Sequence, residues 1–311
     1  MQDHLPPSGA QFEIRHGDLR AVITEVGATL RALHRGDTAL LDGFDIGATA
    51  GGSRGAVLAP WPNRLAGARW TAPDGTLHQL PVSEPRTGCA IHGLVQWEPW
   101  QTAGETRADA VTLEFTLHPR PGYPFTLALQ ATYALDESGL TCTVTATNRG
   151  DGEAPYGIGH HPYIACAGGV DAARLRIPAA RRLELDGSGI PTGRSLDVAG
   201  TPYDFRAPHA VGPLQLDTCY AALEPDADGR VSVDVDGVTV WMAAPFAWLM
   251  VYSGDTLGPE RRRRGLAVEP MTCPPDAFNS GEGLVVLRPG ASCTTRWGIS
   301  PRASADPARP S

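Results

Sequence analysis

The chain has 311 residues, of which 42% are hydrophobic and 19% charged, and its formal net charge is −8. This composition is typical of a globular protein with an ample core, and the absence of interleaved basic and aromatic residues argues against a nucleic-acid partner. All 26 basic residues are arginines, which excludes Schiff-base, pyridoxal-phosphate and Walker-type phosphate chemistry, because each needs a lysine amine.

The six cysteines are widely spaced, and the closest pair, Cys273 and Cys293, is 20 residues apart. This spacing does not fit a Cys-x-x-Cys motif or a zinc ribbon. Residues 1–20 lack the apolar segment of a signal peptide, and no apolar run approaches the length of a membrane span. We therefore expect a soluble cytoplasmic protein with reduced thiols.

Strand patterns follow one another along the chain, and no amphipathic helix longer than about two turns is evident. Asp236-Gly237 between two valine-rich segments predicts a tight hairpin. The segments that alternate or are rich in β-branched residues are 11–15, 20–26, 111–117, 125–135, 140–147, 231–235, 238–242, 248–252, 284–287 and 293–299.

These segments predict an all-β protein of about 16 to 22 strands. Composition does not change along the chain and no internal repeat is visible, which favours one large twisted antiparallel β-sandwich domain over residues 9–300. The ends, residues 1–8 and 301–311, are expected to be flexible.

Two polar motifs lie in the first third of the chain. In Pro60-Trp-Pro-Asn63-Arg64, Asn63 and Arg64 are held by flanking prolines, which makes them pre-organised donors for hydroxyl or carboxylate groups. The simpler interpretation is a surface turn with an exposed Trp61. His92, in Ile-His92-Gly, ends a turn, where a loop histidine bonded to backbone is the simpler interpretation.

Residues 156–163 contain two adjacent histidines. In an extended chain His161 shares a face with two glycines and Tyr163, whereas His160 groups with Ile158 and is interpreted as structural. Adjacent strand residues point to opposite faces, so the two imidazoles do not easily bind one ion, and we predict no metal site.

Residues 265–279 run from a short apolar strand into a proline-rich turn, with Glu269 at the junction. Alternation places Glu269 on one face with Gly265 and Ala267, which are small enough to leave room for a ligand. Asp217 is a second acid, inside an otherwise apolar strand. It suits either the recognition of vicinal hydroxyls or the capping of a turn.

The motifs occur in a fixed order across about residues 12 to 299: Pro60-Trp-Pro-Asn-Arg64, Ile91-His-Gly93, Gly159-His-His-Pro-Tyr163, Leu216-Asp217 and Val268-Glu-Pro-Met-Thr followed by Pro275-Asp-Ala-Phe-Asn279. Together they resemble the aldose 1-epimerase (galactose mutarotase) family, and most closely a bacterial branch with a His-Pro-Tyr motif. The resemblance implies a β-supersandwich and a reaction without a cofactor. By position, Glu269 matches the general base and His161 the general acid. The remaining matches are sugar-binding positions: His92, Arg64, Asp217 and the adjacent Asn63.

The resemblance implies an isomerase that interconverts the α and β anomers of an aldose. Glu269 would take the proton of the anomeric hydroxyl while His161 donates to the ring oxygen, and the roles would reverse when the ring closes. An ordinary histidine pKa of ~6.5 and an ordinary glutamate pKa of ~4.3 suit these roles.

Three alternatives stay open. The chain could be a non-catalytic carbohydrate-binding protein, or a glycoside hydrolase or lyase that uses Glu269 with Asp217. It could also be an epimerase of a phosphorylated or sulfonated sugar, with an anion clamp among Arg54, Arg206 and the four arginines at 261–264. That run is otherwise expected on a solvated loop. In each case the partner is a small sugar, with no nucleic acid or membrane, and the chain is a monomer or homodimer.

Overall fold

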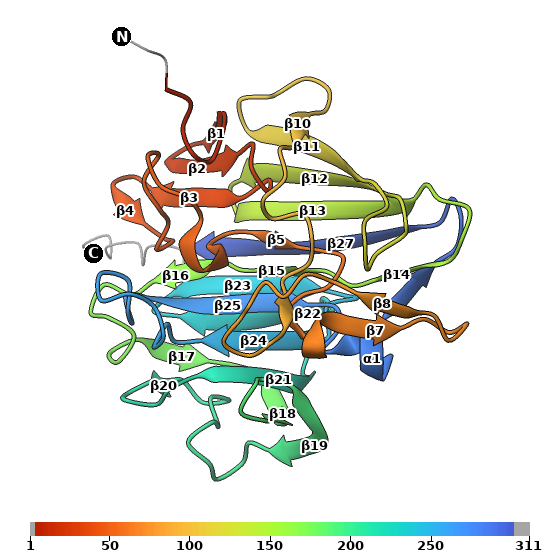
Figure 1. Cartoon of the computed structure of the whole chain (residues 1–311). Helices are drawn as coiled ribbons and strands as arrows, with labels where there is room; N and C mark the ends of the chain where they lie inside the picture. Colours follow the sequence, from red (N-terminus) through yellow and green to blue (C-terminus); the bar gives the residue numbers. More distant parts are fainter. Residues whose placement is uncertain (1–3, 302–311) are drawn as a thin grey trace, which may run out of the picture.

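The computed structural model describes residues 4–301 and consists mainly of two large antiparallel sheets (Figure 1). The first has nine strands, in the spatial order β10 (Gln101–Thr102), β11 (Ala110–Leu117), β12 (Leu127–Asp136), β13 (Gly139–Asn148), β27 (Ser292–Pro301), β23 (Val238–Ala243), β22 (Arg230–Val235), β17 (Arg174–Arg176) and β20 (His209–Ala210). The second has eight: β19 (Pro191–Asp197), β18 (Ala179–Leu185), β21 (Asp217–Leu223), β24 (Trp248–Tyr252), β25 (Gly265–Met271), β15 (Gly159–His160) and β5 (Val57–Leu58), with β16 (Tyr163–Ala165) also paired to β25.

The remaining elements are small. A four-stranded sheet contains β1 (Gln11–His16), β2 (Leu19–Thr24), β3 (Leu30–Arg35) and β4 (Thr38–Ala39). Three strand pairs are β6 (Arg64–Leu65) with β9 (Ala90–Ile91), β7 (Arg69–Thr71) with β8 (Leu77–Gln79), and β14 (Ala154–Tyr156) with β26 (Val285–Leu287). The helical turns are η1 (Gly51–Ser53), η2 (Ala66–Ala68) and α1 (Ala277–Ser280). No helix within residues 4–301 is long and apolar enough to cross a bilayer.

The predicted all-β class is confirmed, and the predicted hairpin at Asp236-Gly237 joins β22 to β23. The predicted strand number is too low, since residues 4–301 contain 27 strands. Many of the additional strands are two or three residues long, too short for alternation to reveal them. Ser8 is buried and its carbonyl accepts a hydrogen bond from the Val26 N–H, and β27 ends at Pro301. The expected flexible ends at 1–3 and 302–311 lie outside the described residues.

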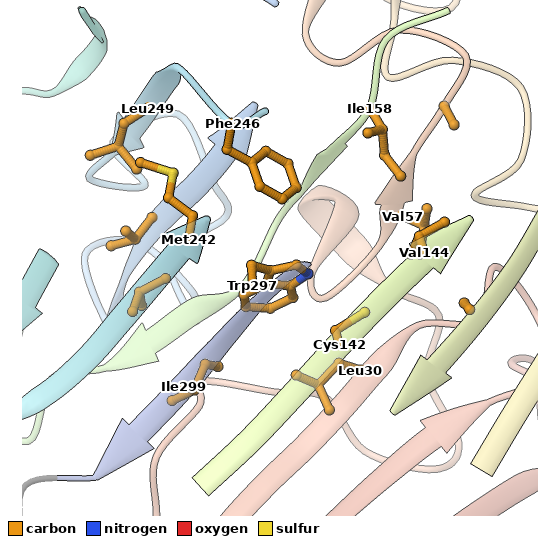
Figure 2. Close-up of a cluster of buried hydrophobic side chains, with 14 of the residues drawn as sticks. Leu30, Val57, Cys142, Val144, Ile158, Met242, Phe246, Leu249, Trp297 and Ile299 are labelled. Atoms are coloured by element: carbon orange, nitrogen blue, oxygen red, sulfur yellow. The ribbon is translucent and has the colours of Figure 1, made fainter. Parts of the chain in front are cut away.

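The inner faces of the two large sheets contribute to one apolar cluster. Figure 2 shows Trp297 of β27 at its centre, with Cys142 and Val144 of the neighbouring strand on one side and Phe246 and Met242 on the other. Each fully buried large side chain of this kind stabilises the fold by roughly 1.5–3 kcal/mol, so the cluster fixes how the sheets lie against each other.

His160 faces this core, as expected for a structural residue. Its ring centroid lies 4.9 Å from that of Trp297 and 6.0 Å from that of Phe246, and neither ring nitrogen has a hydrogen-bond partner within residues 4–301. Burial lowers the pKa of His160 to about 3. The core therefore contains a neutral imidazole that resists protonation while the chain is folded.

We predict that His160→Phe reduces the acid sensitivity of the fold. In the unfolded chain this histidine binds a proton below about pH 6.5, so the folded state loses stability as pH falls from about 6.5 towards 3. Between pH 8 and pH 5 the loss due to one such group is about 2 kcal/mol, and the variant should not show it. The measurement is denaturant unfolding at both pH values, with His118→Phe at an exposed position as the control. An equal pH difference in the wild type and His160→Phe would contradict the prediction.

Candidate active site

Glu269 lies within strand β25, all seven residues of which are buried. The strand runs on to Met271, so Glu269 is inside the strand and not at its junction with the turn, as the sequence had suggested. Met250 of β24 lies directly opposite Glu269 on one side. On the other side, β15 pairs with β25 at Met271, and β16 pairs with it at residues 265–267. The segment of chain between β15 and β16 therefore lies beside Glu269.

That segment is His161-Pro162. The His161 N–H donates to the Ala56 carbonyl at 3.1 Å, and the His161 carbonyl accepts from the Gly55 N–H at 2.8 Å. The side chain lies on the face of Glu269, with 3.3 Å between His161 Nε2 and Glu269 Oε1. The interruption between β15 and β16 therefore places an imidazole against a carboxylate where the strand would otherwise continue.

Cross-strand register brings further groups to the same face. Asp217 lies opposite Tyr252, Tyr252 opposite Ala267, and Ala267 opposite Tyr163. Residues that lie directly opposite each other share a face of the sheet, so the Asp217 side chain points to the same side as the Tyr163 ring. That ring stacks on His161 with 5.0 Å between centroids and 12° between planes, which orients the imidazole.

Asn63 and His92 are held together by the β6–β9 pair. The Asn63 N–H donates to His92 Nδ1 at 3.3 Å, and the His92 N–H donates to the Asn63 carbonyl at 2.9 Å. Both residues have positive φ, 57° and 65°. Burial and the charge of Arg64 lower the pKa of His92 to about 3. With Nδ1 accepting, the neutral ring carries its proton on Nε2, so His92 is a neutral donor. Its ring lies edge-on to His161, with 5.2 Å between centroids.

Arg64 is held between two carboxylates. Its Nε and Nη2 donate to the two carboxylate oxygens of Glu84 at 2.7 and 3.0 Å, and its Nη1 lies 3.4 Å from Asp217 Oδ2. Although burial opposes the charge, Glu84 and Asp217 raise the pKa of Arg64 above its usual value. This fork fixes the guanidinium beside the pocket.

All six residues proposed from the sequence line one cavity of about 210 Å³. They come from segments up to 206 residues apart, from Asn63 to Glu269. The other lining residues are Gly52, Ser53, Glu84, Arg86, Ile91, Tyr163, Tyr252, Thr256 and Leu257.

The expectation of ordinary pKa values for Glu269 and His161 is wrong, because both groups are buried. Burial raises the pKa of Glu269 well above its usual range; the charge of Asp217 adds to this shift, and that of Arg64 opposes it. Burial lowers the pKa of His161 well below its usual range, and the neighbouring His92 and Arg54 act in the same direction. Desolvation thus disfavours the charged form of each group when it acts alone.

The small residues near the site have a different role from the one expected. A Cβ on Gly265 would lie 2.6 Å from the Asp42 Cβ, and one on Gly159 would lie 2.8 Å from the Pro62 Cβ. These glycines allow other segments to pack closely and do not create space for a ligand.

The candidate anion clamps are engaged in ion pairs. Asp42, which is 7% exposed, lies 3.2 Å from Arg54, 3.2 Å from Arg264 and 3.6 Å from Arg261. Arg263 pairs with Asp171 and Asp255, and Arg206 pairs with Asp204. The run at 261–264 is therefore largely paired, not a freely solvated loop. Trp61 is buried against Phe278, so the Pro60–Pro62 segment is not a surface turn with an exposed tryptophan.

Sequence reasoning missed Glu84 and Tyr252. Glu84 lies in a Ser-Glu-Pro-Arg segment that resembles any surface turn, and only the need of a buried guanidinium for a carboxylate partner could have suggested it. Tyr252 ends β24, whose pattern gives no indication that the two strands paired with it, β21 and β25, carry Asp217 and Glu269. Within residues 4–301 no group of three or more His, Cys, Asp or Glu side chains is arranged to hold a metal ion.

Comparison with known proteins identifies the family. Residues 10–300 match the model of the family described as aldose 1-epimerase. The chain belongs to the aldose 1-epimerase family. It is 35% identical over 285 residues to the uncharacterized protein YihR of Escherichia coli K12, covering 91% of this chain and 90% of that protein. It is 26% identical over 260 residues to a maltose epimerase of Levilactobacillus brevis, covering 72% of each.

The fold is also that of known family structures. The crystal structure of a GalM/aldose epimerase homologue from C. elegans superimposes with a TM-score of 0.81 at 20% identity, covering 94% of this chain and 99% of that one. This similarity establishes the galactose mutarotase-like fold. Membership of the aldose 1-epimerase family supports a sugar epimerase or mutarotase activity.

We predict that Arg64→Ala destabilises the fold by about 2–4 kcal/mol, because it leaves the partly buried Glu84 carboxylate without its fork. Burial raises the pKa of Glu84, but the hydrogen bonds from Arg64 and Thr87 and the charges of Arg64 and Arg86 together lower it below its usual value. This stabilisation is therefore present above about pH 4.5 and is lost as pH falls. The measurement is urea unfolding at pH 7, and the control is Arg69→Ala at an exposed position on the same segment. Equal stability of the two variants would show that the fork contributes little.

Proposed function

We propose that this protein is an aldose 1-epimerase that interconverts α and β anomers by ring opening and reclosure, with Glu269 and His161 moving the protons. The observation that carries the proposal is the 3.3 Å contact between Nε2 of the buried His161 and Oε1 of the buried Glu269, in a cavity of a size suited to one sugar ring. A pure binding protein needs hydroxyl donors and acceptors but has no need for an acid and a base in contact.

The reaction requires two proton transfers on one ring. Glu269 takes the proton of the C1 hydroxyl, the C1–ring oxygen bond breaks, and the ring oxygen takes a proton from His161. The product is the open-chain aldehyde. After rotation about the C1–C2 bond, the hydroxyl attacks the other face of C1 and returns its proton to His161, while Glu269 returns a proton to the new C1 hydroxyl. Each group ends as it began, so no cofactor is consumed.

The pair needs one proton between its two members. Two arrangements of the pair hold the same number of protons and the same net charge. One is a Glu269 carboxylic acid with a neutral His161, and the other is a Glu269 carboxylate with a His161 imidazolium. Because burial disfavours isolated charges, the neutral arrangement dominates the empty pocket. For ring opening the proton moves from Glu269 to His161, which gives the carboxylate base and the imidazolium acid. The two macroscopic pKa values belong to the pair.

Other side chains would hold the sugar hydroxyls. His92 offers its Nε2–H, Arg64 offers Nη1 and Asp217 accepts at the pocket edge, where its side chain is 46% exposed. Glu269 Oε2 and His161 Nδ1 are buried without hydrogen-bond partners in the described part of the chain. Buried polar atoms of this kind are costly to the folded state.

We expect Glu269→Gln and His161→Asn each to reduce kcat by about 10²–10⁴-fold, because each removes one positioned acid–base group. Polarimetry of freshly dissolved α-glucose, α-galactose and α-xylose measures the effect. Far-UV circular dichroism and thermal unfolding establish that the variants are folded. Near-wild-type turnover in either variant would remove that residue from the mechanism.

The pH–rate profile should be broad. The doubly protonated pair forms only below the lowered pKa of His161, and the fully deprotonated pair forms only above the raised pKa of Glu269. We therefore expect kcat/KM, which reports on the free enzyme, not to fall as pH decreases through about 6.5, the ordinary pKa of histidine. An acid limb with an apparent pKa at or above about 6.5 would contradict this description of the pair.

A further inference from the structure

A basic pocket of about 280 Å³ lies apart from the proposed catalytic cavity and shares no lining residue with it. The pocket lies between strand β3 and the loop that precedes β25. Strand β3 contributes Arg31 and His34, and the loop contributes Arg261 and Arg264. Because the chain carries a net charge of −8, such a concentration of basic side chains around one pocket is a local feature of this surface.

A β-bulge in β3 brings Arg31 and His34 to the same pocket. On either side of Arg31, residues 30 and 32 of β3 lie opposite the consecutive residues 22–23 of β2, so Arg31 is an extra residue without a partner in the pairing. In a regular strand Arg31 and His34 would point to opposite faces, since three positions separate them. The bulge redirects the Arg31 side chain, and both side chains therefore line the pocket.

Arg31 is a guanidinium without a carboxylate partner. Its Nη1 donates to the Phe44 carbonyl at 3.0 Å, and it forms no ion pair within residues 4–301. Its Nη2 is neither buried nor hydrogen-bonded in that part of the chain. Burial lowers the pKa of Arg31 and the charge of Arg20 acts in the same direction, whereas Asp45 opposes them. Arg31 is thus a half-buried cation that lacks the counter-ion such groups normally have.

His34 adds a neutral donor to the pocket. Arg20 Nη2 lies 3.3 Å from His34 Nδ1, and because an arginine can only donate, Nδ1 is the acceptor. Burial lowers the pKa of His34, and the charges of Arg20 and Arg31 act in the same direction, so the ring is neutral near pH 7. The proton of the neutral ring is then on Nε2, which can donate to a ligand.

The acids around the pocket do not neutralise its arginines. The Asp42 side chain is 5% exposed and is approached by Arg54, Arg261 and Arg264, so three positive charges share one buried negative charge. Asp45 is the exposed acid of the lining, and it forms no ion pair among the described residues. Together with the unpaired guanidinium on β3, four arginines face two aspartates, which leaves two positive charges.

We propose that this pocket binds a doubly charged oxyanion, either a free ion such as phosphate or sulfate or the phosphate group of a monoester. Arg31 supplies its Nη2–H groups, His34 supplies Nε2–H, and Arg261 and Arg264 supply positive charge from the opposite wall. Charge-assisted hydrogen bonds from arginine to an oxyanion are stronger than neutral ones, and two negative charges match the excess of the lining. The proposal goes beyond the proposed function and does not depend on it.

An oxyanion in the pocket would join β3 to the loop of residues 253–264. The same loop places Thr256 and Leu257 in the lining of the catalytic cavity. Most residues from 256 to 262 are exposed, so few buried contacts hold this part of the loop. We therefore expect the bound oxyanion to slow backbone hydrogen exchange over residues 256–262.

The test is calorimetric titration with inorganic phosphate, sulfate and glycerol 3-phosphate at constant ionic strength, set with sodium chloride. We expect saturable binding by the wild type and an affinity at least about tenfold lower in Arg31→Gln, because one charge-assisted contact is lost. The matched control is Arg15→Gln, on the same small sheet but exposed and paired with Glu13, and its affinity should equal that of the wild type. No saturable binding of any of the three anions, or equal affinity in Arg31→Gln and Arg15→Gln, overturns the site.

Asp45→Asn tests the same site by a gain of affinity. This exposed residue forms no ion pair in the described part of the chain, so its replacement leaves the packing intact. Removing a like charge beside the anion should raise the affinity by about twofold or more. If Arg31→Gln does not fold, unchanged affinity in Asp45→Asn overturns the proposal by itself.

The three anions also distinguish the sources of the ligand. Glycerol 3-phosphate binding at least as tightly as inorganic phosphate would assign the site to the phosphate group of a larger molecule, and weaker binding would assign it to the free ion. Hydrogen exchange of the saturated protein tests the link to the loop. Unchanged exchange over residues 256–262 would overturn that link.

Discussion

Burial of Glu269 beside His161 is the constraint on which the rest of the site depends. A carboxylate that is 2% exposed in the middle of a strand is unfavourable unless a partner accompanies it. The partner is available because the chain leaves the sheet after β15 and rejoins it at Tyr163, where β16 begins. Between the two strands, the Pro162 carbonyl accepts a hydrogen bond from the Val268 N–H at 3.1 Å. The backbone bonds lost along β25 are thus partly replaced, and the His161 side chain occupies the place where another strand residue would have lain.

The imidazole is held in turn by a stack of charged and aromatic groups. Arg54 lies over the Tyr163 ring at 4.3 Å, and Tyr163 stacks on His161. Arg54 is 3.2 Å from Asp42, which is also approached by Arg261 and Arg264. The arginine run, which looked like a solvated loop or an anion site, therefore anchors the layer behind His161. Such a chain of paired groups restricts the ring far more than an isolated surface contact would.

Much of the fold could be predicted from the sequence, because long strands leave a clear alternation and tight turns leave Gly and Asp signals. The 238–242 and 248–252 segments lie in strands within one residue of their predicted ends. Short strands such as β5 and β15 could not be found, since two residues have no period. Their pairing decides where the site lies, so local pattern alone could not place it.

The candidate site residues were proposed from motifs whose order resembles the aldose 1-epimerase family, and the structure brings them to one cavity. Their contacts with one another were not visible in the sequence. Glu84 shows the limit: its importance arises from Arg64, 20 residues earlier, and no local pattern records that contact. The pKa values were missed for the same reason. Desolvation depends on which other segments cover Glu269 and His161, and those segments are distant in the chain.

The same contact explains why Arg64 does not neutralise Glu269. Arg64 carries one positive charge but is bound to Glu84 and faces Asp217, so this group of three is net negative. An ionised Glu269 beside this group lacks an arginine counter-ion. The charge of Asp217 raises the pKa of Glu269 and that of Arg64 lowers it, and the effect of Asp217 is the larger. The imidazolium of His161 is then the cation that can stabilise the carboxylate. The two charged forms therefore depend on each other, and a proton that leaves one group is accommodated by the other.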